Sequence, residues 1–360
     1  MLIATYVSAI LMKIGIFKQT PTDTHNYTAM KTKLSLLGII ASLSAVVTVS
    51  AQDSAVTKPV GYHTETILGE AFTLLGINVG NAVSAAGDFD ADSAQDNDVD
   101  FTTLLTVGSP YTVQNTTTGE SASVTSFDAN SLTTTLGNIS SGDSYEIRKD
   151  STVNDIFGEN NAAGLGEGDQ GSADVCWIPQ TDGSFVQVYY DAGGFFGSEG
   201  WKEVGGDGSL AGGTVIPFTS SIFIQRRQAA SIDIVFVGHV RTSASTYNLL
   251  ADQFNFVNRV LPVGITLNET GIASENGPID QGTWADGDGD TADVIWVTNG
   301  AGGYDQFYFA EGGFFGDAQW TKVGGDGSDQ GSQELSSGFA IQKRSANSAI
   351  TVAIPSDLDI

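Results

Sequence analysis

The chain of 360 residues carries 15 lysines and arginines against 42 aspartates and glutamates, which is a formal net charge of −27. A surface this acidic repels phosphate backbones and anionic lipids, which excludes nucleic acid and bilayer surfaces as partners. A single cysteine excludes an intramolecular disulfide, and 44 glycines beside a hydrophobic fraction of 41% indicate a folded, turn-rich chain rather than a disordered one.

The N-terminal segment has the pattern of a secretory signal peptide. A lysine pair precedes the apolar run LSLLGIIASLSAVV, and the small residues VSA follow it. We expect residues 1–29 to be an over-extended gene start, the signal to span 30–51 from Met30, and cleavage to follow Ala51. The apolar run is too short for a membrane anchor, so we expect no membrane insertion after cleavage. Cleavage would remove four lysines and one aspartate, and the net charge would become −30.

Two related copies of one long segment occupy most of the chain. GGFFGSEGWKEVGGDGS at 193–209 reappears as GGFFGDAQWTKVGGDGS at 312–328, ADVCWIP as ADVIWVT, and IQRR as IQKR. Upstream, TVND resembles TLNE and AFTLLGI resembles TYNLLAD. We therefore predict a first unit at 58–236 and a second at 237–360. The first is longer because of a block at about 83–150, whose alternating threonine, valine and aromatic residues predict an inserted β-subdomain.

The predicted elements are almost all strands. ADVCWIP has apolar side chains on both faces, as a central buried strand does, and SFVQVYYD follows it after an Asp-Gly turn. PFTSSIFIQRR and SIDIVFVGHV predict another strand pair. TYNLLADQFNFVNRV also fits a short helix, but long capped helical patterns are missing from the sequence. We predict an all-β fold of two related antiparallel β-sandwich or barrel-like units, the first with the inserted β-subdomain.

This layout resembles an uncharacterised family of secreted proteins from Verrucomicrobia-type and related bacteria. The resemblance is carried by GDSYEIRKDSTVNDIFG at 142–158, by ADVCWIP and its copy ADVIWVT, and by the IFIQRR and FAIQKR segments. It covers nearly all of the chain after the signal. The resemblance implies an exported protein with no assigned reaction.

The repeated glycine-rich segments have two interpretations. Paired glycines permit tight turns between strands, and the aromatic residues among them, including Trp201 and Trp320, would then fill the core beneath. The same interpretation places in the core Phe195, Phe196, Phe314 and Phe315. Alternatively, Trp201 and Trp320 stand on surface loops and stack on sugar rings, with Tyr189 and Tyr308 nearby. The first interpretation is favoured, and the second predicts a polysaccharide partner.

Two acidic ladders are candidate calcium sites. Asp286, Asp288 and Asp290 alternate with glycine in WADGDGDTAD. The other ladder, in GDFDADSAQDNDVDF, begins with Asp88, Asp90 and Asp92. Alternating carboxylates on a loop can converge on a hard cation that takes six to eight oxygen ligands, although neither ladder has the glutamate of an EF-hand. The alternative is a solvated acidic loop, and calcium is the one possible cofactor, with none required.

The remaining chemistry-bearing residues favour structural roles. Cys176 exchanges with Ile295 in the second copy, so we expect a small buried side chain rather than a nucleophile. His63 and His239 lie near the starts of the two units, where strand-end roles are expected. The basic residues of IQRR and IQKR either pair with the acidic loops or protect a strand end. No GxSxG, HExxH or phosphate-loop motif occurs, so we identify no catalytic residue.

We therefore expect an exported, non-catalytic β-protein that serves as a structural or adhesive component of the cell surface or its surroundings. It would lie in the periplasm, at the cell surface or outside the cell. A carbohydrate-binding module with an aromatic platform is the alternative. A glycoside-active enzyme is the second alternative, and it needs a cleft with two close carboxylates, one of raised pKa.

Overall fold

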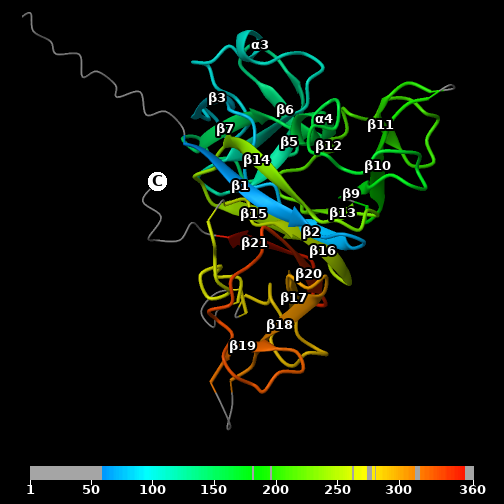
Figure 1. The fold of residues 1–360 in the computed structure, drawn as a ribbon. Helices are drawn as coiled ribbons and strands as arrows, with labels where there is room; N and C mark the ends of the chain where they lie inside the picture. Colours follow the sequence, from blue (N-terminus) through cyan, green and yellow to red (C-terminus); the bar gives the residue numbers. More distant parts are fainter. Residues whose placement is uncertain are drawn as a thin grey trace, which may run out of the picture. The chain divides into compact units, whose positions relative to one another are not determined.

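The computed structural model describes residues 59–180, 182–194, 197–261, 263–273, 278–279, 281–312 and 317–352. The expected gene-start and signal segments lie outside these residues, as do the four phenylalanines of the two GGFFG motifs. The regular structure of the described residues is almost entirely β-strand, with two short helices (Figure 1). The predicted all-β fold is confirmed.

A five-stranded antiparallel sheet forms the first unit. Its strand order is β11–β10–β9–β13–β2. The bounds are β2 (Phe72–Leu75), β9 (Val175–Pro179), β10 (Phe185–Asp191), β11 (Gly200–Glu203) and β13 (Ile222–Gln225). A separate two-stranded ribbon pairs β1 (Val60–Ile67) with β14 (Ile232–His239) in antiparallel register.

The second unit has the same strand order. Its sheet runs β16–β20–β17–β18–β19, and its own ribbon pairs β15 with β21. The bounds are β15 (Ser245–Leu249), β16 (Gln253–Asn258), β17 (Val294–Thr298), β18 (Tyr304–Ala310), β19 (Gln319–Lys322), β20 (Gly338–Lys343) and β21 (Ser348–Val352). Strand for strand, the two units therefore share one sheet order.

The inserted β-subdomain is a third five-stranded antiparallel sheet, ordered β3–β7–β4–β5–β6. Its strands are β3 (Val83–Asp88), β4 (Tyr111–Asn115), β5 (Ser121–Phe127), β6 (Leu132–Thr134) and β7 (Ser144–Lys149). The short helix α3 (Phe101–Leu104) begins after Asp100, whose side chain accepts a hydrogen bond from the Thr102 backbone N–H. Phe101, Val113 and Tyr145 belong to a hydrophobic cluster of their own.

The connection from the insert back to the first unit is short. β8 (Ser151–Thr152) pairs with β12 (Val215–Ile216), and helix α4 (Val153–Phe157) follows directly. Thr152 and Asp155 form a reciprocal capping box at the start of this helix. The described residues contain no helix with the length and hydropathy that crossing a bilayer requires.

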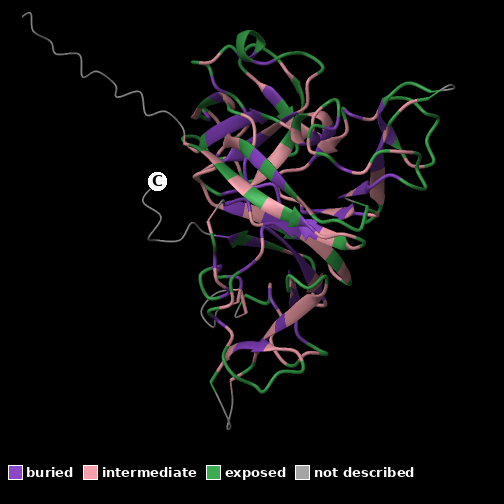
Figure 2. Cartoon of the chain, in the orientation of Figure 1, coloured by how far each residue is buried: buried purple, intermediate pink, exposed green. Residues whose placement is uncertain are grey.

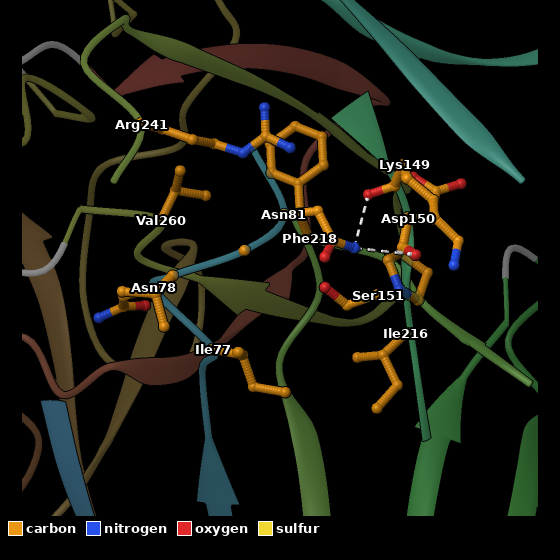
Figure 3. Close-up of a pocket in the computed structure, with 13 residues that line it drawn as sticks. Ile77, Asn78, Asn81, Lys149, Asp150, Ser151, Ile216, Phe218, Arg241 and Val260 are labelled. Atoms are coloured by element: carbon orange, nitrogen blue, oxygen red, sulfur yellow. Dashed lines mark hydrogen bonds between the residues drawn. The ribbon is translucent and has the colours of Figure 1, made fainter. Parts of the chain in front are cut away.

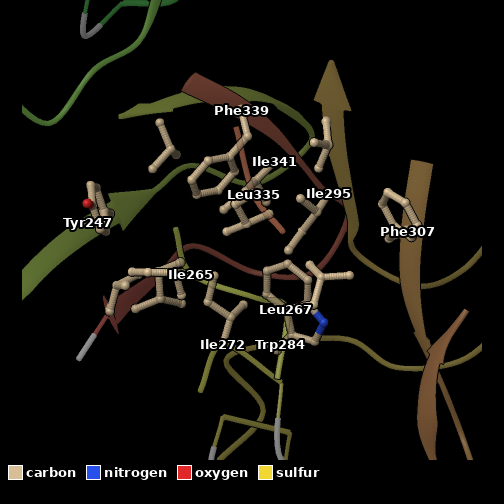
Figure 4. Close-up of a cluster of buried hydrophobic side chains, with 14 of the residues drawn as sticks. Tyr247, Ile265, Leu267, Ile272, Trp284, Ile295, Phe307, Leu335, Phe339 and Ile341 are labelled. Atoms are coloured by element: carbon tan, nitrogen blue, oxygen red, sulfur yellow. The ribbon is translucent and has the colours of Figure 1, made fainter. Parts of the chain in front are cut away.

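Each unit buries one face of its sheet. In the second unit Ile295, Phe307 and Ile341 pack with Trp284 and Leu267 (Figure 4). In the first unit Cys176 occupies the place of Ile295 and is fully buried, as the exchange of the two residues predicted. Burial raises the pKa of its thiol, so Cys176 behaves as a small apolar side chain.

The segment TYNLLADQFNFVNRV is not a helix. It forms β15 and β16, joined by a tight turn at Asp252 with φ +57°. Buried Tyr247 and Leu249 alternate with exposed Asn248, which is the two-residue period of a strand. The same stretch also has apolar residues three or four positions apart, which is why its sequence was compatible with a helix.

Candidate functional site

The tryptophans of the two glycine-rich segments lie in the cores. Trp201 is 2% exposed and Trp320 is 0% exposed. Trp201 Nε1 donates to the Gly158 carbonyl oxygen at 2.8 Å, and its ring lies edge-on to Tyr190. Trp320 lies edge-on to Phe309, with ring centroids 5.5 Å apart. Stacking on a sugar needs an exposed ring face, so neither indole ring can act as a platform.

The accompanying tyrosines lie on the opposite, outer face of each sheet. Tyr189 opposes Val175 across β10 and β9, and it is 8% exposed. Tyr308 opposes Val294 at the corresponding place of the second unit and is half-buried. The tyrosine of the second unit is therefore partly exposed, whereas that of the first unit is buried.

A second repeated tryptophan pair occupies the centres of the outer faces. Trp177 on β9 and Trp296 on β17 are both half-buried. Trp177 opposes Gln187 on β10, and Trp296 opposes Gln306 on β18. An aromatic ring beside an amide therefore occurs at matching places in the two units.

The edge strand of each sheet adds a phenylalanine to this arrangement. Phe72 on β2 is 46% exposed and Phe254 on β16 is 42% exposed. Phe72 lies 5.9 Å from Trp177 and Phe254 lies 5.3 Å from Trp296, measured between ring centroids. Gln225 opposes the first of these phenylalanines, and Gln342 opposes the second. We call each of these two sets an outer aromatic face. The set on the first sheet comprises Phe72, Trp177, Gln187, Tyr189 and Gln225, and the set on the second comprises Phe254, Trp296, Gln306, Tyr308 and Gln342.

Three phenylalanines connect the two outer aromatic faces. The Phe256 ring lies 5.4 Å from the Phe185 ring and 5.0 Å from the Phe223 ring, although Phe256 belongs to the second unit and the other two to the first. Trp177 in turn lies 6.0 Å from Phe185. The rings thus form one run across both sheets, with its most exposed members at Phe72 and Phe254.

The glutamines of the outer aromatic faces have free hydrogen-bonding capacity. Within the described ranges, the side chains of Gln187, Gln225 and Gln306 make no hydrogen bond with protein groups, and all three are half-buried. A shallow depression beside Phe72 includes Gln225 and Arg227 in its lining. Apolar rings with unpaired amides beside them can hold a ligand that has both apolar faces and hydroxyl groups.

The acidic ladder of the second unit forms a turn. Asp288 Oδ1 accepts from the Asp290 N–H at 3.0 Å, from the Thr291 N–H at 2.9 Å and from the Thr291 hydroxyl at 2.8 Å. These bonds, that of the Thr291 hydroxyl first, lower the pKa of Asp288. Asp169 in the first unit accepts in the same way from Ser172.

The ladder of the insert is likewise bonded to its own chain. Asp88 accepts from the Ser144 hydroxyl at 2.6 Å, and Asp92 accepts from the Ser141 N–H at 3.1 Å. Asp90 accepts from a backbone N–H in its own loop. In the part of the chain described, no three histidine, cysteine, aspartate or glutamate side chains are placed to share a metal ion. Calcium binding by either ladder, including Asp286 and Asp290, stays a prediction.

Basic residues at the ends of β13 and β20 pair with buried aspartates. Arg226 Nη1 lies 2.7 Å from Asp174 Oδ2, and Lys343 Nζ lies 2.6 Å from Asp293 Oδ2. Both aspartates belong to the repeated ADV motif. Sequence reasoning singled out the basic residues but missed these partners, although an aspartate at the same place in both copies was a visible signal.

The neighbouring arginines donate hydrogen bonds to the backbone of the acidic loops. Arg344 Nη1 donates to the Gly289 and Ala292 carbonyl oxygens at 2.8 and 2.7 Å. Arg227 Nη1 donates to the Gln170 carbonyl oxygen at 2.8 Å. The basic residues therefore contact the acidic loops, one of the two predicted roles, through backbone oxygens and a buried carboxylate.

A small cavity lies where the insert meets both units (Figure 3). Asn81 Nδ2 donates there to the carbonyl oxygens of Lys149 and Asp150 at 3.1 and 3.4 Å, and Arg241 lies over the Phe218 ring. Burial raises the pKa of Asp150. Asp150 is the one carboxylate among the described residues that line this cavity, so it holds no carboxylate pair of the kind a glycosidase uses.

The two histidines are bonded within the fold. His63 Nε2 lies 3.2 Å from the Gly76 carbonyl oxygen, and burial lowers the pKa of His63, which favours its neutral form. The backbone of His239 exchanges two hydrogen bonds with Gly80. Both contacts are structural.

No protein-family model matches the chain, and comparison with curated proteins and with solved structures also finds no match. The resemblance to the Verrucomicrobia-type secreted family therefore stays a prediction. The candidate function rests on the geometry of the outer aromatic faces.

Proposed function

We propose that this chain is an exported, non-catalytic adhesive protein that binds a neutral polysaccharide through its outer aromatic faces. The half-buried pair Trp177 and Trp296, each beside an unpaired glutamine amide, is the observation that carries the proposal. Sugar rings have apolar faces that stack on aromatic rings and hydroxyl groups that bond to amides. Export is inferred from the N-terminal pattern of the sequence.

Charge selects the neutral class of polymer. With a net charge of −27, the chain repels polyanions such as uronic-acid polysaccharides. The aromatic rings and glutamine amides of each outer aromatic face are uncharged, so a neutral glycan that contacts them loses little solvation of charged groups on binding. Two matching faces in one chain also favour a long polymer, because the second contact becomes intramolecular once the first has formed.

Affinity electrophoresis tests this proposal. The purified chain would be run through gels that contain hydroxyethylcellulose, soluble starch or xylan, and through a gel that contains polygalacturonate. We expect retardation in at least one neutral gel and none in the polygalacturonate gel. Trp177→Ala should weaken binding about tenfold, or ~1.4 kcal/mol.

Val107→Ala is the control, because Val107 is an exposed apolar residue of the inserted β-subdomain, outside both faces and outside the β1–β14 ribbon. Its retardation should equal that of the unmodified chain. Equal retardation of the Trp177→Ala variant, or no retardation in any neutral gel, would contradict the proposal.

A further inference from the structure

The outward main-chain groups of β1 can be assigned from its pairing with β14. Val60 opposes His239, and at the adjacent pair the Val240 N–H donates to the Pro59 carbonyl oxygen at 2.9 Å. In an antiparallel ladder this makes Val60 and His239 a pair without mutual hydrogen bonds, and every second residue shares that orientation. The N–H and C=O groups of Tyr62, Thr64 and Thr66 therefore point away from β14.

The two edges of this ribbon differ in their partners. On the β14 edge, the His239 backbone bonds in both directions to Gly80, at 2.8 and 3.0 Å. On the β1 edge, no hydrogen bond from any described residue reaches the outward groups of Tyr62, Thr64 or Thr66. β1 is thus an open edge strand in the described structure.

The related ribbon in the second unit has its edge covered. Thr246 on β15 corresponds to Thr64, because TETILGEAF aligns with TYNLLADQF and both segments form the same strand and turn. The Thr246 N–H donates to the Gly119 carbonyl oxygen at 2.9 Å, and its hydroxyl donates to the Thr118 carbonyl oxygen at 3.0 Å. A hairpin of the insert therefore occupies on β15 the position that is empty on β1.

The exposed side of β1 lacks the usual protection of an edge strand. Natural edge strands are protected by lysine, proline or a bulge. The residues of β1 with outward main-chain groups are Val60, Tyr62, Thr64 and Thr66, which we call the outward row, and β1 pairs with β14 without a bulge. Tyr62 is 73% exposed, and Val237 opposite it is 69% exposed. In Figure 2, β1 alternates between exposed and less exposed positions. The corresponding face of the β15–β21 ribbon carries Thr246, Asn248, Ala349 and Thr351.

We propose that the occupant of the β1 edge is the β1 strand of a second copy, in antiparallel orientation. Such a pair is self-complementary, because Tyr62 then opposes Thr64 of the other copy while the exposed side chains stay on one face. Val60, Tyr62, Thr64 and Thr66 are uncharged, which limits the repulsion between two chains that each carry −27. Asp233 is the exposed carboxylate on β14 beside them, and it accepts a hydrogen bond from the Thr66 hydroxyl. β14, β1 and their two counterparts would form one four-stranded sheet.

The size of the contact sets its strength. Eight residues at about 3.4 Å each make a seam of roughly 27 Å, and two ribbon edges bury on the order of 800 Å², the range of weak and transient contacts. We therefore expect a dimer that forms reversibly at micromolar to sub-millimolar concentration. It should tighten with added salt, because salt screens the repulsion between the two acidic chains. This inference is independent of polysaccharide binding.

Sedimentation velocity of the purified full-length chain tests it, at rising protein concentration and at low and high salt. We expect a monomer–dimer equilibrium that salt strengthens. Thr64→Pro removes an outward N–H but leaves the hydrogen bonds between β1 and β14 in place, so it should weaken dimerisation by about tenfold or more. Thr64→Val keeps the N–H and should dimerise like the unmodified chain. A monomer at every concentration and salt level, or an unchanged dimer in Thr64→Pro, would overturn the inference.

Hydrogen exchange on the unmodified chain decides the matter if the proline variant does not fold. The amides of Tyr62 and Thr64 should exchange rapidly in dilute solution and be protected as concentration rises. Amides on β14 that bond to β1 should be equally protected at both concentrations. Exchange at Tyr62 and Thr64 that does not depend on concentration would rule out this pairing.

Discussion

Lys343 and Asp293 form an ion pair in which neither side chain is exposed, with Nζ 2.6 Å from Oδ2. Asp293 also accepts hydrogen bonds from the Ala285 and Arg344 backbone N–H groups, at 2.9 and 2.7 Å, and from the Ser345 hydroxyl. Through these hydrogen bonds the carboxylate links the end of β20 to the start of β17 and to the loop that precedes β17.

Asp293→Asn should lower the free energy of unfolding by about 3–5 kcal/mol, because the Lys343 ammonium would stay buried without a counter-charge. Urea denaturation measures the change. Asp288→Asn is the matched control: Asp288 is exposed, an asparagine oxygen can accept the same turn hydrogen bonds, and its effect on the free energy of unfolding should be much smaller. Equal effects of the two substitutions would contradict the structural role of the buried pair.

Acidification should weaken the fold through the same carboxylate. Burial alone would raise the pKa of Asp293, but the hydrogen bonds from Lys343 and Ser345 outweigh it and hold the pKa below its usual value. A lowered pKa stabilises the fold above the unfolded-state pKa of about 3.9, and that contribution is lost as the pH falls through the folded-state value.

The urea midpoint of the unmodified chain should therefore fall between about pH 5 and pH 3 more steeply than that of Asp293→Asn. Asp169 and Asp288 also have lowered pKa values and contribute to both curves, so the informative quantity is the difference between the two chains. Parallel curves would show that Asp293 does not titrate with folding.

Calcium removal should leave the fold unchanged. Asp288, the centre of the second ladder, already accepts three hydrogen bonds from its own turn, and Arg344 holds the adjacent backbone. Chelation with EDTA should shift the unfolding temperature by less than about 1 °C. A fall of several degrees that added calcium reverses would instead assign a metal site to one of the acidic ladders.

The two repeated tryptophan pairs should differ in what they contribute to stability. Trp320→Ala removes a fully buried ring and should cost about 3–5 kcal/mol, whereas Trp296→Ala removes a half-buried ring and should cost less than half as much. Chemical denaturation of the two variants measures both. Equal losses would mean that Trp296 is a core residue and that the outer aromatic faces are not accessible.

Much of the fold could be predicted because strand patterns are local. The alternation in the insert and the Asp-Gly turn before SFVQVYYD depend on neighbouring residues only. The alternating segment forms strand β4, and the segment after the turn forms strand β10. Aligning AFTLLGI with TYNLLAD was wrong, because the tight turns at Glu70 and Asp252, both with positive φ, are the matching positions. Strand β2 therefore corresponds to β16, and no local pattern distinguishes two adjacent strands of similar composition.

The candidate site was harder to predict because one residue decides the face of a strand. Cys176 and Ile295 were expected in the core, and strand alternation places Trp177 and Trp296 beside them on the other face. That signal was present in the sequence. Trp201 gave no such signal, because β11 is short and buries three consecutive residues. The contact of Phe256 with Phe185 joins distant segments, which sequence patterns do not encode.

Polysaccharide binding by the outer aromatic faces is tested most directly by calorimetric titration of the Trp177→Ala/Trp296→Ala double variant. The titrant is a hexasaccharide of whichever neutral polymer retards the unmodified chain. We predict that binding heat is lost in the double variant while its circular dichroism spectrum is unchanged. Undiminished affinity in a folded double variant would contradict the account and place the ligand elsewhere on the molecule.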